Sequence, residues 1–196
     1  MSLFIAIEGL DGSGQSTQTR LLKKWFISIG KSCIATKEPT NGLIGGLIRA
    51  QLMGEWRSNP EALQLLFAAD RAVHLEKEIL PALDKGTNVI TDRYLFSSIA
   101  YGMVDLDKEW LKQINSRFRL PDITIYLNVS PEECLNRLKG SRTRLELFER
   151  EDYLKKVHKN YMVVSKDYKN FFVIDGEKPI KEVHENIITL IKKLME

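Results

Sequence analysis

Short apolar runs alternate with longer amphipathic stretches along the chain. Residues 3–8 form a near-continuous apolar run, which is typical of a strand buried in a parallel sheet. Similar runs predict four more strands, at residues 32–36, 88–92, 123–129 and 171–175. The intervening segments predict helices, among them residues 16–29, a long helix that begins at Pro60, and a last helix over about 179–195. Strands separated by helices imply right-handed crossovers, so the pattern predicts an α/β fold with a five-stranded parallel sheet flanked by helices.

Helix-start signals sharpen two of these boundaries. Asn59 is an expected N-cap of the long helix, because Pro60 suits the first helical position. After the fourth predicted strand, Ser130 is an expected N-cap, and Glu133 stands at the partner position of a capping box. No linker, repeat or low-complexity tract interrupts the pattern, so we expect one domain over residues 1–196.

Composition and charge narrow the function classes. The 29 Lys and Arg residues against 26 Asp and Glu give a formal net charge of +3, too small and too scattered to indicate nucleic-acid binding. The two cysteines, Cys33 and Cys134, form neither a disulfide framework nor a metal motif. No apolar run is long enough to span a bilayer, and the first residues lack the basic start of a signal peptide. We therefore expect a cytoplasmic protein with no nucleic-acid or membrane partner.

A glycine-rich segment, "GLDGSGQST" (residues 9–17), joins the first predicted strand to the first predicted helix. It matches the phosphate-binding pattern G-x-x-x-x-G-K-[ST] at every position but one. Its glycines let backbone N–H groups converge on an anion at the helix N-terminus, and the Ser16 hydroxyl is placed to bind Mg²⁺. A tight turn that needs glycine only for packing is the alternative. The expected phosphate-binding residues are Gly9, Leu10, Asp11, Gly12, Ser13, Gly14, Gln15, Ser16 and Thr17.

Gln15 is the exception, because it stands where the pattern has lysine. A charge-assisted hydrogen bond is roughly twice as strong as a neutral one. Losing the lysine should therefore cost a transition state on the order of 2–4 kcal/mol, unless another cation compensates. Two interpretations stay open: an active phosphoryl-transfer enzyme whose missing charge comes from elsewhere, and a nucleotide-binding regulatory protein that has lost turnover.

The third predicted strand ends in Asp92 and Arg93, a second candidate for phosphate chemistry. A carboxylate at this position can hold Mg²⁺ from its outer coordination shell, beside Ser16, and an arginine can bridge two phosphates. An ion pair at a strand end is the simpler alternative.

These residues belong to a longer series of segments that resembles the thymidylate kinase family. The matching segments, in order and at family spacing, are "FIAIEGLDGSGQSTQ" (4–18), "TKEPT" (36–40), "LLFAADRAVH" (65–74), "DRYLFSSIAY" (92–101) and "RTRLELFEREDYLKKV" (142–157). The resemblance covers nearly the whole chain. It implies the P-loop kinase fold, a short lid at about residues 139–149, and conversion of dTMP to dTDP with ATP and Mg²⁺. A related nucleotide kinase with another base preference is the nearest alternative. The family is usually homodimeric, so a homodimer is expected.

At the thymine base, the resemblance implies roles for five residues. Phe67 would stack on the ring and Arg71 would hydrogen-bond its O4. Their i, i+4 spacing independently places both on one helix face, although core packing is the alternative for Phe67. Pro39 and Glu38 would form a wall and the rim of the pocket, and Ser98 would lie near the base.

At the sugar and phosphates, Asp11 would hold the 3′-hydroxyl of dTMP. Tyr101 would pack under the sugar, where a 2′-hydroxyl would collide. Arg93 would bind the acceptor phosphate and the transferring group, and Arg49 is a further candidate whose alternative is a helix-surface ion pair.

The lid would supply the charge that Gln15 lacks, through Arg142 and Arg144. Together with Asp11 and Arg93, these arginines form the expected catalytic set. Residues 175–179 would flank the adenine of ATP, and His74 is interpreted as a packing or surface residue.

Overall fold

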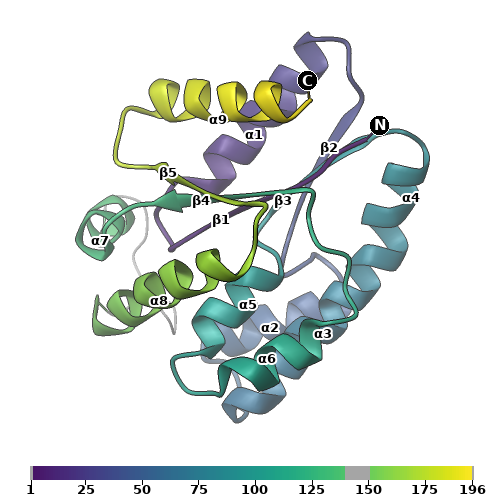
Figure 1. Cartoon of the computed structure of the whole chain (residues 1–196). Coiled ribbons are helices and arrows are strands. Elements are labelled where there is room, and N and C mark those ends of the chain that lie inside the picture. Colours follow the sequence, from purple (N-terminus) through teal and green to yellow (C-terminus); the bar gives the residue numbers. More distant parts are fainter. Residues whose placement is uncertain (1, 140–150, 196) are drawn as a thin grey trace.

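A computed structural model of the chain describes residues 2–139 and 151–195 (Figure 1). Its centre is a five-stranded sheet in the order β2-β3-β1-β4-β5, in which every neighbouring pair is parallel. The strands are β1 (Phe4–Gly9), β2 (Cys33–Lys37), β3 (Asn88–Asp92), β4 (Ile123–Asn128) and β5 (Phe171–Asp175). Each lies within one residue of the range expected from its apolar run, so the predicted parallel α/β sheet is confirmed.

Helices follow every strand and cover both faces of the sheet (Figure 1). They are α1 (Gln15–Ser28), α2 (Leu43–Leu52), α3 (Pro60–His74), α4 (Leu80–Asp84), α5 (Leu95–Gly102), α6 (Lys108–Asn115), α7 (Pro131–Lys139), α8 (Glu151–Val164) and α9 (Ile180–Met195). One π-helical turn (Leu75–Ile79) joins α3 to α4, and a 3₁₀ turn (Ser165–Asp167) follows α8. Within the described ranges, no helix has the length and apolar character that crossing a membrane requires.

The alternation of side chains along β1 divides the core into two layers. Ile5 and Ile7 pack with buried residues of α1 and α9, whereas Phe4 and Ala6 pack with those of α5 and α8. Figure 1 shows these helix pairs on opposite faces of the sheet. Because successive strand side chains point to opposite faces, a central strand between two helix layers must be apolar at every position. This requirement explains why the strands appear in the sequence as continuous apolar runs.

The parallel register gathers the carboxyl ends of the strands at one edge. Asp92 of β3 lies opposite Ile7 of β1 on one side and opposite Lys37 of β2 on the other. Ligands of open parallel sheets bind beyond this edge, next to the strand where the order reverses. In this chain that strand is β1, and the glycine-rich segment leaves directly from it.

The N-cap of α3 was predicted correctly, whereas at α7 the expected start at Pro131 is right and the capping box is wrong. The Asn59 side chain accepts a hydrogen bond from the Ala62 N–H at 2.9 Å, as expected for the N-cap of α3. At α7, however, the backbone N–H of Ser130 donates to Glu177 at 2.9 Å. Glu133 instead accepts from Arg137 Nε at 2.8 Å. The capping box is therefore wrong, because a carboxylate from the segment after β5 takes the place of the local one.

Candidate active site

A cavity of about 940 Å³ opens at the carboxyl edge of the sheet and unites most of the predicted site. The glycine-rich segment lines one end, and Pro39, Phe67 and Arg71 line another part. The predicted residues that line the cavity are Asp11, Gly12, Ser13, Gly14, Gln15, Ser16, Thr17, Glu38, Pro39, Phe67, Arg71, Asp92, Arg93, Ser98 and Tyr101. Gly9 and Leu10 do not line it, since Gly9 is the last residue of β1 and the Leu10 side chain is fully buried in the core.

The phosphate-binding segment has the backbone that an anion site needs. Gly12 and Gly14 adopt φ values of 87° and 98°, a left-handed conformation that strongly favours glycine. Gly14 is the N-cap of α1, and no side chain caps this helix. The first N–H groups of an α-helix have no partner within the helix. Those of α1 therefore face the cavity end as donors for a phosphate, and the helix dipole adds positive charge there.

Gln15 does not replace the missing lysine. Its amide Nε2 donates to the backbone carbonyl of Gly9 at 3.2 Å, and its side chain is only 6% exposed. The amide thus stabilises the loop from within and adds no charge to the cavity.

Ser16 and Asp92 lie together as expected for two ligands of one cation. The Ser16 hydroxyl donates to Asp92 Oδ2 at 2.5 Å, although the two residues lie 76 positions apart in the sequence. Burial raises the pKa of Asp92 above its ordinary value, and nearby Arg93 and the Ser16 hydrogen bond lower it in part. An all-oxygen pair beside a phosphate-binding loop fits Mg²⁺, which commonly takes one or two protein oxygens and completes its shell with water and phosphate.

Contacts with the phosphate-binding segment hold Arg93 in place. Its guanidinium donates to Asp11 Oδ1 at 2.8 Å, the Gly9 carbonyl at 2.9 Å and Ser97 Oγ at 3.1 Å. Its φ of 70° is unusual for a residue other than glycine. Strained backbone of this kind concentrates at functional sites, because the surrounding structure must over-determine it.

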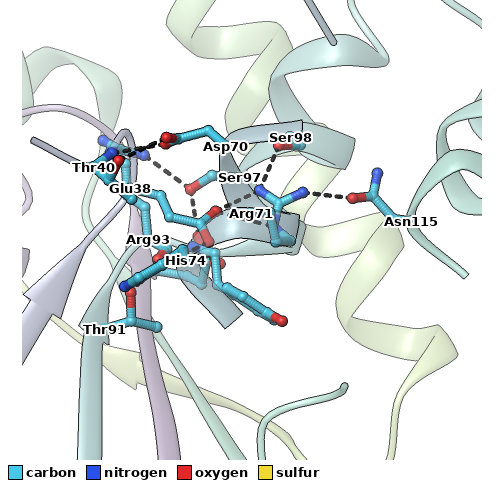
Figure 2. Close-up of polar contacts among 12 residues, drawn as sticks. Glu38, Thr40, Asp70, Arg71, His74, Thr91, Arg93, Ser97, Ser98 and Asn115 are labelled. Carbon is cyan, nitrogen blue, oxygen red and sulfur yellow. Dashed lines mark hydrogen bonds and ion pairs between the residues drawn. The ribbon is translucent and has the colours of Figure 1, made fainter. Parts of the chain in front are cut away.

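Arg71 is the centre of a buried polar network, shown in Figure 2. The side chain is 1% exposed, and its guanidinium donates twice to Glu38 Oε2, at 2.6 and 2.9 Å. It also donates to Ser98 Oγ at 2.9 Å and to Asn115 Oδ1 at 2.5 Å. These contacts use four of the five N–H donors of an arginine. One Nη1 N–H is therefore left for a ligand in the cavity.

Helix α3 also fixes the segment that follows β2. Asp70 accepts from both the backbone N–H and the hydroxyl of Thr40, at 2.7 and 2.6 Å (Figure 2). His74 Nδ1 lies 3.1 Å from Glu38 Oε1, and its Nε2 lies 2.7 Å from Thr36 Oγ1. The histidine is buried, so its interpretation as a packing residue is right but omits its polar contacts.

Phe67 and Asp11 complete the two ends of the expected acceptor site. Phe67 lies one turn before Arg71 on α3, is half-buried and lines the cavity. Asp11 Oδ2 accepts from the Tyr101 hydroxyl at 3.2 Å, and Tyr101 is 7% exposed. Tyr101 therefore forms a firm wall next to Asp11, beneath the Arg93 guanidinium that lies 5.2 Å from its ring centre.

Glu8 is a buried acidic residue that was not predicted, and Ser97 links it to Arg93. The carboxylate is fully buried and accepts from the Tyr94 N–H at 3.0 Å, Ser97 Oγ at 2.5 Å and the Tyr161 hydroxyl at 3.0 Å. Burial raises the pKa of Glu8 to about 7, against the lowering effect of Ser97 and Arg93. The sequence held one signal for this residue: Glu8 is the only acidic residue of the apolar run 3–8, at the end of a strand that was expected to be buried.

The cavity lining also bears on the expectations for Arg49 and for residues 175–179. Arg49 lines the cavity, but it donates to the carbonyls of Pro39 and Thr40 and forms no ion pair among the described residues. Part of the 175–179 segment lines the cavity as expected, through residues 176–179. Arg142 and Arg144 lie outside the described residues, as does most of the expected lid. Gln64 and Arg137 also line the cavity and lie outside the segments that carry the resemblance, whereas Lys37 lies inside one of them (36–40) but was assigned no role.

Comparison with known proteins agrees with the resemblance seen in the sequence. The family model described as thymidylate kinase matches residues 7–187. A probable thymidylate kinase of Pyrococcus abyssi is 42% identical over 195 residues, which cover 96% of this chain and 95% of that protein. One from Methanocaldococcus jannaschii is 42% identical over 98% of this chain and 97% of its own length. A bacterial thymidylate kinase, from Thermosipho melanesiensis, is 38% identical over 99% of this chain and all of its own length.

Proposed function

Because this chain belongs to the thymidylate kinase family, we propose that it transfers the terminal phosphoryl group of ATP to dTMP, giving dTDP and ADP. One observation carries the proposal: a single cavity joins an anion-binding loop to a base-sized site formed by Phe67 and Arg71. The loop suits a polyphosphate, and the ring and donor suit a planar base with a carbonyl oxygen. The proposed reaction would place one nucleotide at each end of this cavity.

The reaction needs alignment and charge neutralisation, and no covalent intermediate with the protein. An oxygen of the dTMP phosphate forms the new bond to the γ-phosphorus while the bond to the β,γ-bridging oxygen breaks, and ADP leaves with that electron pair. Arg93 is placed to bind the acceptor phosphate and the transferring group, because it lies between Asp11 and the loop. Asp11 would accept a hydrogen bond from the 3′-hydroxyl of the sugar.

We propose that Ser16 and Asp92 hold Mg²⁺ with the donor phosphates. The ion would neutralise part of the charge on those phosphates and orient them. The 2.5 Å hydrogen bond from Ser16 Oγ to Asp92 Oδ2 supports the proposal, because it brings the two oxygens side by side next to the phosphate-binding loop.

The quaternary state and compartment are further parts of the proposal. Leu43 and Leu47, one turn apart on α2, are 85% and 45% exposed, and Leu65 of neighbouring α3 is 51% exposed. An apolar surface over two packed helices suits a homodimer. A reducing compartment such as the cytoplasm suits Cys33 and Cys134, which are free and buried. Light scattering after gel filtration of the wild type and of Leu47→Glu tests the dimer: the variant should elute as a monomer.

A coupled assay of ADP release tests the proposed reaction. The purified chain is mixed with ATP and Mg²⁺ and with each of a panel of deoxy- and ribonucleoside monophosphates. We expect the highest kcat/KM with dTMP and no turnover in EDTA. Preference for another monophosphate would identify a related kinase with a different base. Tight nucleotide binding without ADP release would identify a binding protein instead.

A further inference from the structure

Six cationic side chains of the described residues line the cavity, and five of them are already engaged by the protein. Arg71 pairs with Glu38, Arg93 pairs with Asp11, and Lys178 pairs with Glu182. Arg137 pairs with Glu133 and also donates to the Gly176 carbonyl, and Arg49 donates to two backbone carbonyls. The sixth is Lys37, which is exposed and makes no hydrogen bond or ion pair with any residue of the described ranges.

The sheet places Lys37 at the expected metal site. Lys37 ends β2, and its Cα lies in register opposite that of Asp92 in β3. Paired residues of parallel strands point to the same face, and here that face is the one covered by α1, since Cys33 of the same alternation packs with α1 residues. Ser16 at the start of α1 donates to Asp92 on this face. The Lys37 ammonium therefore projects from the same corner as the two expected Mg²⁺ ligands.

A second cavity, of about 750 Å³, supports this placement. It runs along the edge strand β2 and α1, and it shares only three lining residues with the main cavity: Ser16, Lys37 and Asp92. The two cavities thus meet at the metal corner, and Lys37 stands at their junction.

We propose that Lys37 is a catalytic residue that contacts the terminal phosphate of ATP and supplies part of the charge missing at Gln15. The inference rests on the proposed kinase function. Phosphoryl transfer spreads negative charge over the oxygens of the moving group, and a cation from the end of a neighbouring strand can neutralise it as a loop lysine would. A long lysine with no ion-pair partner in the described part of the chain has the reach and the donors for this role, and Gln15 has neither the charge nor a free orientation.

Kinetics and binding of four proteins test the role of Lys37: wild type, Lys37→Met, Lys37→Arg and Lys23→Met. Lys23 is the matched control, because it lines only the second cavity and has no ion-pair partner among the described residues. With saturating dTMP and Mg²⁺–ATP, we expect Lys37→Met to lower kcat at least tenfold. Lys37→Arg should stay within about threefold of the wild type, and Lys23→Met should match it.

Calorimetric titration in EDTA provides a readout that is independent of turnover. Lys37→Met should weaken ATP binding several-fold more than ADP binding, because only ATP has the phosphate that the ammonium would contact. Retained ADP affinity shows that the variant is folded. A kcat within about twofold of the wild type, or equal losses for ATP and ADP, would overturn the proposal. If the wild type failed to phosphorylate dTMP, the kinase function would fail, while the ATP and ADP comparison would still decide whether Lys37 contacts the terminal phosphate.

Discussion

The two ends of the cavity differ in how their positive charge is held. At the base end, the Arg71 guanidinium is almost fully buried and is fixed by Glu38, Ser98 and Asn115. At the donor-phosphate end, the loop offers backbone N–H groups and the neutral Gln15, and the nearby Lys37 is exposed, with no ion-pair partner in residues 2–139 or 151–195. One end is assembled before any ligand arrives, whereas the nearest lysine at the other end, Lys37, is exposed.

The difference reflects what each end must do. A base is distinguished by a few hydrogen bonds in fixed positions, so rigid, buried donors give the discrimination. A transferring phosphoryl group changes its charge distribution during the reaction, and cations that contact it in the transition state stabilise that change. Exposed cations can do so without the cost of a buried, unpaired charge in the free protein. The following predictions test this contrast, from the largest expected effect to the smallest.

Arg71→Ala should disrupt the base end most strongly. Removing Arg71 breaks a buried ion pair and leaves Glu38 with only its contact to His74 among the described residues, at a typical cost of about 3–5 kcal/mol in the free energy of unfolding. The lost contact to the base should raise the KM for dTMP by about ten- to a hundredfold and change the KM for ATP little. Urea unfolding and steady-state kinetics measure the two effects. Adding Glu38→Gln should restore part of the stability but none of the affinity for dTMP. Equal rises in both KM values would indicate that Arg71 has only a structural role.

Glu8 should make the free energy of unfolding depend on pH. Its buried carboxylate is bonded by the neutral hydroxyls of Ser97 and Tyr161, whereas the buried carboxylate of Glu38 has the charged Arg71 as its partner. Burial raises the Glu8 pKa from 4.5 to about 7. The folded state therefore binds a proton that the unfolded state releases between these values. The stabilisation from this group is complete below about pH 4.5 and is lost as the pH rises through about 7, in total on the order of 3 kcal/mol. Glu8→Gln cannot titrate, so the stability of the wild type relative to this variant should fall between about pH 5 and about pH 8 in urea unfolding. Parallel pH profiles would contradict the prediction.

Arg142→Ala/Arg144→Ala tests whether the expected lid supplies charge to the donor-phosphate end. We expect kcat to fall tenfold or more, with a smaller loss of ATP affinity. Gln15→Lys should leave kcat unchanged or raise it and should blunt this loss, a coupling that a double-mutant cycle measures. The matched control is Arg57→Ala/Arg117→Ala, which removes two exposed arginines that do not line the cavity. Full activity of the lid variant would mean that the compensating charge lies elsewhere.

Substitutions of Tyr101 test whether the rigid wall beside the expected sugar site selects deoxyribose. The ring is buried and its hydroxyl bonds Asp11, so a ribose 2′-hydroxyl should collide with it, at a cost of about 1–3 kcal/mol. Tyr101→Phe should keep the preference for deoxyribose, and Tyr101→Ala should relax it by about tenfold. Turnover of the deoxy and ribo forms of one pyrimidine monophosphate measures the ratio. Equal use of both forms by the wild type would show that the wall does not select.

The sequence by itself determined the features that depend on near neighbours in the chain. The five strands follow from continuous apolar runs, because a central strand must be apolar on both faces. The phosphate-binding loop follows from glycines at Gly12 and Gly14 that must take positive φ values. The pairing of Phe67 with Arg71 follows from the 3.6-residue helical repeat, which puts both on one face of α3.

Only the tertiary structure decided which distant groups meet. Arg71 finds Glu38 across 33 positions, Arg93 finds Asp11 across 82, and Glu177 takes the Ser130 N–H that a local capping box assigns to Glu133. The lack of an acidic partner for Lys37 among the described residues was equally invisible, because a lysine at the end of a strand has the same local pattern whether or not an acidic side chain folds beside it. Hydrogen bonds and ion pairs form between atoms within about 3 Å, and the strand order that brings those atoms together is set by the packing of the whole sheet between its helices.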